Sequence, residues 1–160
     1  MDLVTLVNIL VACANVGNLL LGRPLHAWGE KTGCNGDVVF DNTLLDMYSK
    51  CGYLKGAIDV FAEMDKTSIV SWTSIIVAYV RKGLYDVAIT LFDELQSKGL
   101  KPDACTISSV VHACACSNSL DKGSNIHNFI KKNNMRLNLP VSIMFSCICM
   151  QNVESWKKLI

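Results

Sequence analysis

The sequence predicts an all-α fold, a solenoid in which helix pairs stack side by side into an α-α superhelix. Three observations lead to this prediction. The chain aligns with itself at fixed offsets without gaps, each aligned unit holds two apolar stripes at helical spacing, and glycines separate the stripes. One helix pair cannot bury both of its apolar faces, whereas stacked pairs bury a continuous core and expose one long concave surface.

The internal similarity occurs at two offsets. Shifting the chain by 101 residues places 5–26 on 106–127, and shifting it by 31 residues places 38–64 on 69–95. The first offset gives the identical pairs Thr5/Thr106, Ala12/Ala113, Cys13/Cys114, Ala14/Ala115, Leu19/Leu120, Gly22/Gly123, His26/His127 and Lys31/Lys132. The second gives Val39/Val70, Tyr48/Tyr79, Gly52/Gly83, Ala57/Ala88, Ile58/Ile89, Phe61/Phe92 and Glu63/Glu94. We therefore expect a repeat array over 1–142, with units at 3–37, 38–68, 69–103 and 104–138.

Each unit is predicted to form two helices, and unit 69–103 illustrates the pattern. Its first apolar stripe is Ile75, Ile76, Tyr79 and Val80, and its second is Val87, Ala88, Leu91, Phe92 and Leu95. Gly83 separates the two stripes. Lys98, Gly99 and Pro102 then give the residue order that is typical of a helix end. Gly17, Gly33 and Gly52 mark predicted helix ends in the other units in the same way.

The composition suits a folded domain and limits the functional classes. Hydrophobic residues make up 51% of the chain and charged residues 18%, which is enough to bury a core. The formal net charge is only +1, so the strongly basic balance of many nucleic-acid binders is absent, and any binding of nucleic acid would have to rest on the local placement of charged residues. Residues 3–22 carry no charge, but their counterpart 104–123 contains Asp121 and Lys122, which argues against a membrane span.

The cysteines and histidines are predicted to be structural. We interpret the eight cysteines as reduced core residues of an intracellular protein, because several lie within apolar helical patterns. They are Cys13, Cys34, Cys51, Cys105, Cys114, Cys116, Cys147 and Cys149. Cys114-x-Cys116 and Cys147-x-Cys149 lack the two-residue gap of zinc knuckles, so neither metal nor cofactor is expected. His26 and His127 match in register, which favours packing or capping.

The units resemble a known repeat. Residues 69–103 (IVSWTSIIVAYVRKGLYDVAITLFDELQSKGLKPD) resemble the 35-residue pentatricopeptide motif, and 41–64 resemble the short motif of its plant-specific subclass. The pattern ACA…G…H…K at 12–31, echoed at 113–132, resembles the long motif. The order long, short, standard, long matches that subclass. This resemblance implies a binder of single-stranded RNA in plant mitochondria or chloroplasts, related to factors that specify cytidine-to-uridine editing.

The resemblance also implies which residues read bases. In this family the fifth residue of the first helix and the last residue of the motif contact one base per repeat. These positions are Asn42 with Ser68, which implies a pyrimidine, cytosine in particular, and Thr73 with Asp103, which implies guanine. Amide and hydroxyl groups suit a base edge because they donate and accept hydrogen bonds.

Further residues follow from the same motif positions. Val39 and Val70 would flank the bases through apolar contact, and Lys50 and Arg81 would reach phosphates. Each of these side chains could instead have only a structural role. Val39 and Val70 could be packing residues, and Lys50 and Arg81 could be solvated surface charges. Val7 and Ser108 hold the fifth position of the two long motifs, and we expect little reading at Val7 because it cannot form hydrogen bonds.

No catalytic function is expected. Some relatives in this subclass end in a cytidine-deaminase-like domain, which needs His-x-Glu and a later Cys-x-x-Cys. Neither pattern occurs, since the nearest approach, His26 and Glu30, has three residues between its members. No phosphate loop and no nucleophile constellation is evident either.

The two ends of the chain lead to expectations of their own. Met1 is followed almost at once by a unit, without a transit peptide. After Ser142 the register fails, and residues 148–159 can be back-translated so that another frame reads MYAKCGKLEKA, which resembles 47–57. We therefore expect a frameshift near Ser142, a non-native tail at 143–160, and a fragment of a longer factor.

Three functional hypotheses remain open at this point. The first is a sequence-reading module for single-stranded RNA, with proteins of an editing complex as further partners and with no membrane or DNA role. The second is a helical scaffold for a protein partner, because solenoids commonly serve that purpose. The third is a truncated gene product without activity.

Overall fold

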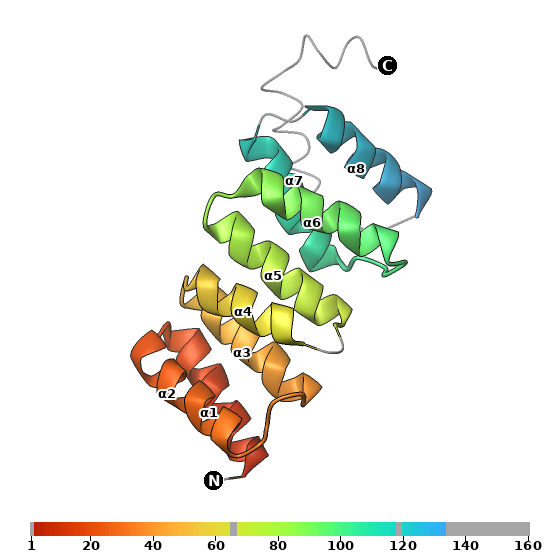
Figure 1. The fold of residues 1–160 in the computed structure, drawn as a ribbon. Coiled ribbons are helices and arrows are strands. Elements are labelled where there is room, and N and C mark those ends of the chain that lie inside the picture. Colours follow the sequence, from red (N-terminus) through yellow and green to blue (C-terminus); the bar gives the residue numbers. More distant parts are fainter. Residues whose placement is uncertain (1, 65–66, 118–119, 134–160) are drawn as a thin grey trace.

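The computed structural model describes residues 2–64, 67–117 and 120–133, and this part of the chain consists of helices and short connections (Figure 1). The helices are α1 (Leu3–Val16), α2 (Leu19–Lys31), α3 (Val38–Lys50), α4 (Leu54–Glu63), α5 (Ile69–Arg81), α6 (Tyr85–Ser97), α7 (Ala104–Cys116) and α8 (Leu120–Lys132). The predicted all-α class is therefore confirmed. The tail predicted at 143–160 lies outside the described residues.

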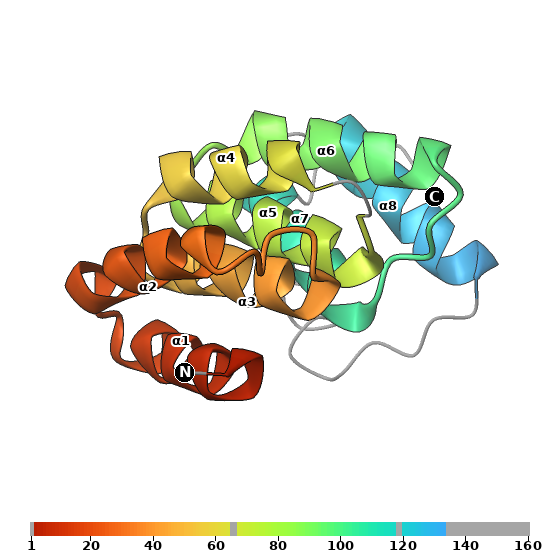
Figure 2. The same ribbon diagram turned by 60° about the horizontal axis from the view of Figure 1, so that its bottom comes forward.

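The helices form two layers that run along the stack. Figure 2 shows α4 and α6 above the row that contains α3 and α5. Each odd-numbered helix packs closely on the next odd-numbered one. The described even-numbered helices lie farther from one another, although α6 and α8 touch through the rings of Phe92 and Phe129, whose centroids are 6.1 Å apart. Because the odd-numbered helices lie closer together, their row is the inner, concave side of the stack.

Local sequence signals set the helix limits. Gly17 adopts a left-handed backbone with a φ of 72°, which ends α1, and the Asn18 side chain accepts a hydrogen bond from the Leu21 amide to begin α2. The uncharged stretch 3–22 is thereby divided between two helices. In the described part of the chain, every helix is too short or too polar to cross a membrane.

The core is continuous from α1 to α8. One cluster of buried side chains joins α1, α3, α4 and α5, and a second joins α5, α6, α7 and α8. Phe61, Tyr79 and Leu91 are partly buried and pack against both clusters. Each helix pair therefore shares its apolar surface with the next, as expected for stacked repeats.

The predicted stripes of unit 69–103 are largely buried, with one exception. Ile75 and Ile76 of α5 and Ala88 and Phe92 of α6 have at most 2% of their surface exposed. Val87 is 41% exposed, so its assignment to the core stripe is wrong. Successive helical residues lie about 100° apart, and Ala88 already occupies the direction that faces α5.

The cysteines do not all belong to the core. Cys13 and Cys114 are buried as predicted, but Cys105 and Cys116 are exposed, which corrects the interpretation for those two. Cys105 is the second residue of α7 and Cys116 its last, and both positions lie outside the buried stripe. All six cysteines in the described residues are free thiols, and Cys147 and Cys149 lie beyond them.

The two register-matched histidines differ in environment. His26 is partly buried, with its Nδ1 2.8 Å from the Tyr48 hydroxyl and its Nε2 3.6 Å from a carboxylate oxygen of Glu30. His127, by contrast, is exposed on α8. Among the described residues, no three His, Cys, Asp or Glu side chains are placed to hold a metal ion.

Close packing of α2 on α3 gives a stability prediction. A methyl group at Gly29 would overlap the fully buried ring of Phe40, so Gly29→Ala should lower the free energy of unfolding by about 1–3 kcal/mol. At Gly123, an added Cβ would meet nothing closer than the Cys114 Cβ, at 4.0 Å. Gly123→Ala should therefore be neutral or stabilise the protein by about 0.5–1 kcal/mol, since alanine favours helix. Urea denaturation of both variants tests the contrast, and equal effects would contradict it.

The thiols should react with iodoacetamide in the order of their exposure. Burial raises the pKa of Cys114 to about 11, from an ordinary value of 9.0, so at pH 8 it holds roughly a hundredth as much thiolate as an ordinary thiol. Among the six cysteines in the described residues, mass spectrometry should find Cys116 modified before Cys114. Cys114 should react only as the pH rises towards 11 or after unfolding in guanidinium. Equal rates in the folded protein at pH 8 would argue against the burial described.

Candidate nucleic-acid interface

Four side chains that precede the inner helices are N-caps. Asp2, Asp37, Ser68 and Asp103 each accept a hydrogen bond from a backbone amide in the first turn of the following odd-numbered helix, at 2.9, 2.9, 3.4 and 2.7 Å respectively. These bonds satisfy amides that have no partner within the helix. Ser68 and Asp103, two of the predicted base-reading residues, are therefore structural caps as well.

The structure brings Asn42 and Ser68 together through a third residue, Ser71. The Ser71 hydroxyl donates to the Asn42 Oδ1 at 2.7 Å, and its oxygen accepts from the Ser68 amide at 3.1 Å. The two serine hydroxyl oxygens are 3.3 Å apart. Asn42 lies on α3 and Ser71 on α5, so the network joins the starts of two neighbouring inner helices.

The same arrangement joins Thr73 and Asp103 through Thr106. The Thr106 hydroxyl donates to the Asp103 Oδ1 at 2.8 Å, and the hydroxyl oxygens of Thr73 and Thr106 are 2.6 Å apart. Thr73 also donates to the Ile69 carbonyl oxygen at 2.8 Å. Thr106 is fully buried and Thr73 is 9% exposed, whereas Asp103 is exposed, so the carboxylate is the most accessible member of this network.

Both predicted flanking valines face solvent. Val39 is 60% exposed and Val70 52% exposed, and each is the second residue of an inner helix. Val4 and Cys105 hold the same place on α1 and α7 and are also exposed. A single exposed valine needs no explanation, but recurrence at one helix position marks a row of apolar side chains beside the polar networks.

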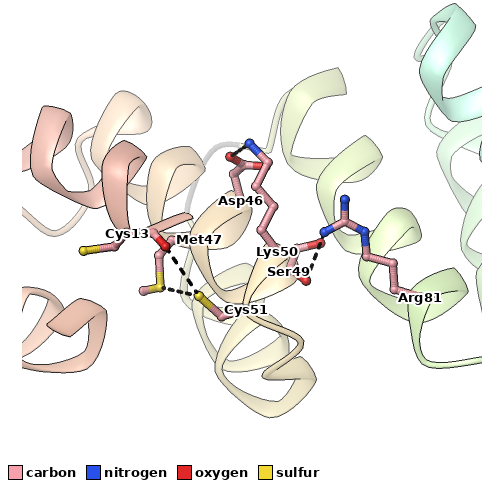
Figure 3. Close-up of polar contacts among 7 residues, drawn as sticks. All are labelled: Cys13, Asp46, Met47, Ser49, Lys50, Cys51 and Arg81. Carbon is pink, nitrogen blue, oxygen red and sulfur yellow. Dashed lines mark hydrogen bonds and ion pairs between the residues drawn. The ribbon is translucent and has the colours of Figure 1, made fainter. Parts of the chain in front are cut away.

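The two predicted phosphate ligands lie at the opposite ends of the same helices. Lys50 and Arg81 are each eight residues beyond Asn42 and Thr73, which is about 12 Å along a helix. Figure 3 shows the Lys50 ammonium turned back onto Asp46, at 2.7 Å, and the Arg81 guanidinium reaching from α5 to the Ser49 carbonyl oxygen, at 3.4 Å. Both cations border an open hollow of about 380 Å³, which Asn15 also lines.

A second hollow, of about 240 Å³, contains ionisable groups but no evident chemistry. It is lined by His26, Asp41 and Glu63 together with Asn35, Gly36, Leu44 and Val60. Burial raises the pKa of the Asp41 carboxyl, and the nearby carboxylates of Asp37 and Glu63 raise it further. A hydrogen bond from the Gly36 backbone amide and the electrostatic effect of His26 act in the opposite direction and lower this pKa. Within the described residues these groups are not arranged as metal ligands.

The long-motif units offer less for base reading. Val7 is partly exposed, and the residue that would bridge it to Asp37 is Phe40, which is fully buried and apolar. No polar network can form at that junction, in keeping with the expectation for Val7. Ser108 is partly exposed on α7, but the end of its unit lies outside the described residues.

Ser71 and Thr106 are the functional candidates that the sequence analysis missed. Each is the third residue of its unit, and their hydroxyls connect the predicted pair of the preceding unit. The identity of Thr5 and Thr106 in the self-alignment was a signal for this position. Its meaning was hidden because the partners are 29 and 33 residues away in sequence.

Comparison with known proteins agrees with this architecture. Two family models match the chain, one described as PPR repeat over residues 42–69 and one as PPR repeat family over residues 67–116. Residues 42–116 contain pentatricopeptide repeats. Both networks lie within these matches, because residues 42–116 include Asn42, Ser68, Ser71, Thr73, Asp103 and Thr106.

Curated pentatricopeptide proteins of Arabidopsis thaliana are similar in sequence. DOT4, named as chloroplastic, is 44% identical over 113 residues, which cover 71% of this chain and 13% of that protein. A second chloroplastic protein is 36% identical, covering 99% of this chain and 21% of its own length. A mitochondrial one is 35% identical, covering 79% and 16%. The chain therefore spans about a fifth of these relatives or less.

Solved pentatricopeptide structures share the fold. PPR10 from maize, in complex with an 18-nucleotide psaJ RNA element, superposes with a TM-score of 0.78 at 19% identity, covering 94% of this chain and 23% of that one. The pentatricopeptide domain of the Arabidopsis protein-only RNase P 1, in complex with tRNA, gives a TM-score of 0.76 at 15% identity, covering 94% and 81%.

The double role of Asp103 gives a stability prediction. Asp103→Ala removes the cap of α7 and should lower the free energy of unfolding by about 1 kcal/mol. Asp103→Asn keeps a side-chain oxygen for the Thr106 amide and should cost only a few tenths of a kcal/mol. Chemical denaturation of the two variants distinguishes these cases. A loss in Asp103→Asn as large as that in Asp103→Ala would mean that the charge, rather than the cap, stabilises the helix.

Proposed function

We propose that this chain is a module that binds single-stranded RNA and reads bases with its second and third repeats. The observation that carries the proposal is the repetition of one polar network at two neighbouring junctions of the inner row. At each junction the fifth residue of a repeat and its last residue lie within one hydrogen-bonded group. One base per helical repeat is the geometry by which such arrays recognise RNA.

The site supplies the contacts that single-stranded RNA needs. Polar groups at each junction can bond to a base edge, and the exposed Val39 and Val70 beside them can contact base faces. Lys50 and Arg81 add positive charge at the far ends of α3 and α5, where we place the phosphates. The proposed assignments are cytosine at Asn42 with Ser68 and guanine at Thr73 with Asp103.

The wider context is also a proposal. Relatives named as chloroplastic or mitochondrial support an organellar setting, and the order of unit types over 3–138 supports the plant-specific subclass linked to RNA editing. We infer that the chain acts by binding, without catalysis or cofactor, and that any chemistry on the RNA depends on editing-complex proteins. A frameshift near Ser142 remains part of this proposal.

Binding can be tested with the 160-residue chain and short labelled RNAs. Octamers of adenosine that carry CG or GC at the centre should bind more tightly than oligoadenosine, in one of the two orders, by about tenfold for each base read. The variant Asn42→Ala, Thr73→Val, Asp103→Asn should lose this preference. Fluorescence anisotropy at low salt, where phosphate contacts are strong, gives the measurement.

A matched control uses the same three residue types on the outer helices. Asp59→Asn, Thr90→Val and Asn128→Ala change exposed side chains of α4, α6 and α8 and should leave the preference intact. Thermal denaturation would verify that both triple variants fold. Equal binding of all octamers by the native chain would contradict base reading and favour a scaffold for protein partners.

A further inference from the structure

We propose that the third residue of each repeat sets the base preference of the repeat before it, by fixing where the protons of that junction point. The residues are Ser71 and Thr106, and they act as positioning residues, since their hydroxyls bond to the base-reading side chains. The inference rests on the proposed RNA-binding function and adds to it the origin of base choice.

At the first junction the proton of Ser71 is committed to Asn42. Ser71 has one hydroxyl proton, which it donates to the Asn42 Oδ1 at 2.7 Å. Its oxygen accepts from the Ser68 amide at 3.1 Å, so the 3.3 Å contact between the two hydroxyls must use the proton of Ser68. The Asn42 amide is thereby held with its oxygen towards α5 and its NH₂ group available as a donor.

An amide held in this way separates the two pyrimidines. Cytosine has an unprotonated N3 that accepts a hydrogen bond, whereas uracil carries a proton on N3 and can only donate there. An NH₂ group that is fixed opposite N3 therefore suits cytosine and opposes uracil. A freely rotating amide would suit both, because it could offer its oxygen to uracil. Ser71 thus converts a side chain that reads either pyrimidine into one that reads cytosine.

At the second junction the hydroxyl protons of Thr73 and Thr106 are both used within the protein. Thr106 donates to the Asp103 Oδ1 at 2.8 Å, and the one hydroxyl proton of Thr73 is shared between the Ile69 carbonyl oxygen, at 2.8 Å, and the Thr106 oxygen, at 2.6 Å. The exposed Asp103 carboxylate is therefore the acceptor that this junction offers, while the proton of the nearly buried Thr73 points into the protein. Guanine offers two donors on its pairing edge, N1–H and the N2 amino group. Adenine has an acceptor at N1, which this junction would oppose.

The test compares base preference in the full chain. The native protein should prefer the central cytosine to uracil by about tenfold, equivalent to about 1.4 kcal/mol. Ser71→Ala frees the amide, so the preference should fall below about twofold, mainly through a gain for uracil. Ser71→Thr should restore it, because threonine already serves at this position in Thr106. Ser74→Ala, on the same helix and outside the network, should behave as the native protein does.

Thr106→Val makes the corresponding change at the second junction, so the inference can still be tested if Ser71→Ala does not fold. Its backbone amide still bonds to Asp103, so the cap of α7 is kept, and only the hydroxyl is lost. The preference for guanine over adenine should fall while that for cytosine over uracil stays. NMR adds a measurement without RNA, since the Asn42 side-chain amide signals should move in Ser71→Ala and not in Ser74→Ala.

The outcomes are distinct. An unchanged cytosine preference in folded Ser71→Ala would overturn this inference and leave RNA binding in place. A native chain that binds RNA without separating cytosine from uracil would overturn it as well. Absence of RNA binding by the native chain would overturn the proposed function itself, and this inference with it.

Discussion

The whole inner surface depends on the need to satisfy the first amides of each inner helix. A helix start leaves several N–H groups without intrahelical partners, and here a side chain just before each odd-numbered helix supplies an acceptor. The residue types that do this well are short and polar. Such residues also bond well to base edges, so capping and the proposed recognition can use the same side chain.

Packing of the inner row turns these caps into a shared site. Because the odd-numbered helices contact one another directly, the cap of one helix lies beside the first turns of the preceding one. This proximity allows Ser71 to reach Asn42 and Thr106 to reach Thr73, although each pair belongs to different repeats. The outer helices contribute apolar faces that hold the row together.

Sequence reasoning was strongest where the repeat register supplied the information. Helix starts, the glycine ends and the buried positions Ile75, Ala88 and Phe92 follow from periodicity and self-alignment. It was weaker at single residues whose environment depends on neighbouring helices. Val87 and Cys116 have suitable apolar character, yet their direction or place at a helix end leaves them exposed. Periodicity alone does not fix which of two adjacent apolar residues faces the core.

The candidate site shows the same division. The pairs of Asn42 with Ser68 and of Thr73 with Asp103 came from resemblance, and their place as predicted RNA contacts is unchanged by the structure. Linear sequence does not reveal that a third side chain joins each pair, because the bonds cross 29 and 33 residues. Nor does it reveal that Thr73 is 9% exposed while its partner carboxylate faces solvent.

The crossing of these bonds between repeats bears on how such arrays could be rebuilt. A cut after Ser68 would transfer a repeat with both Asn42 and Ser68, but would leave Ser71 behind with the next repeat. The transplanted repeat would then take its preference from whichever third residue followed it. A cut placed after Ser71 would keep the three side chains together, so the transferable piece is offset from the sequence repeat by three residues.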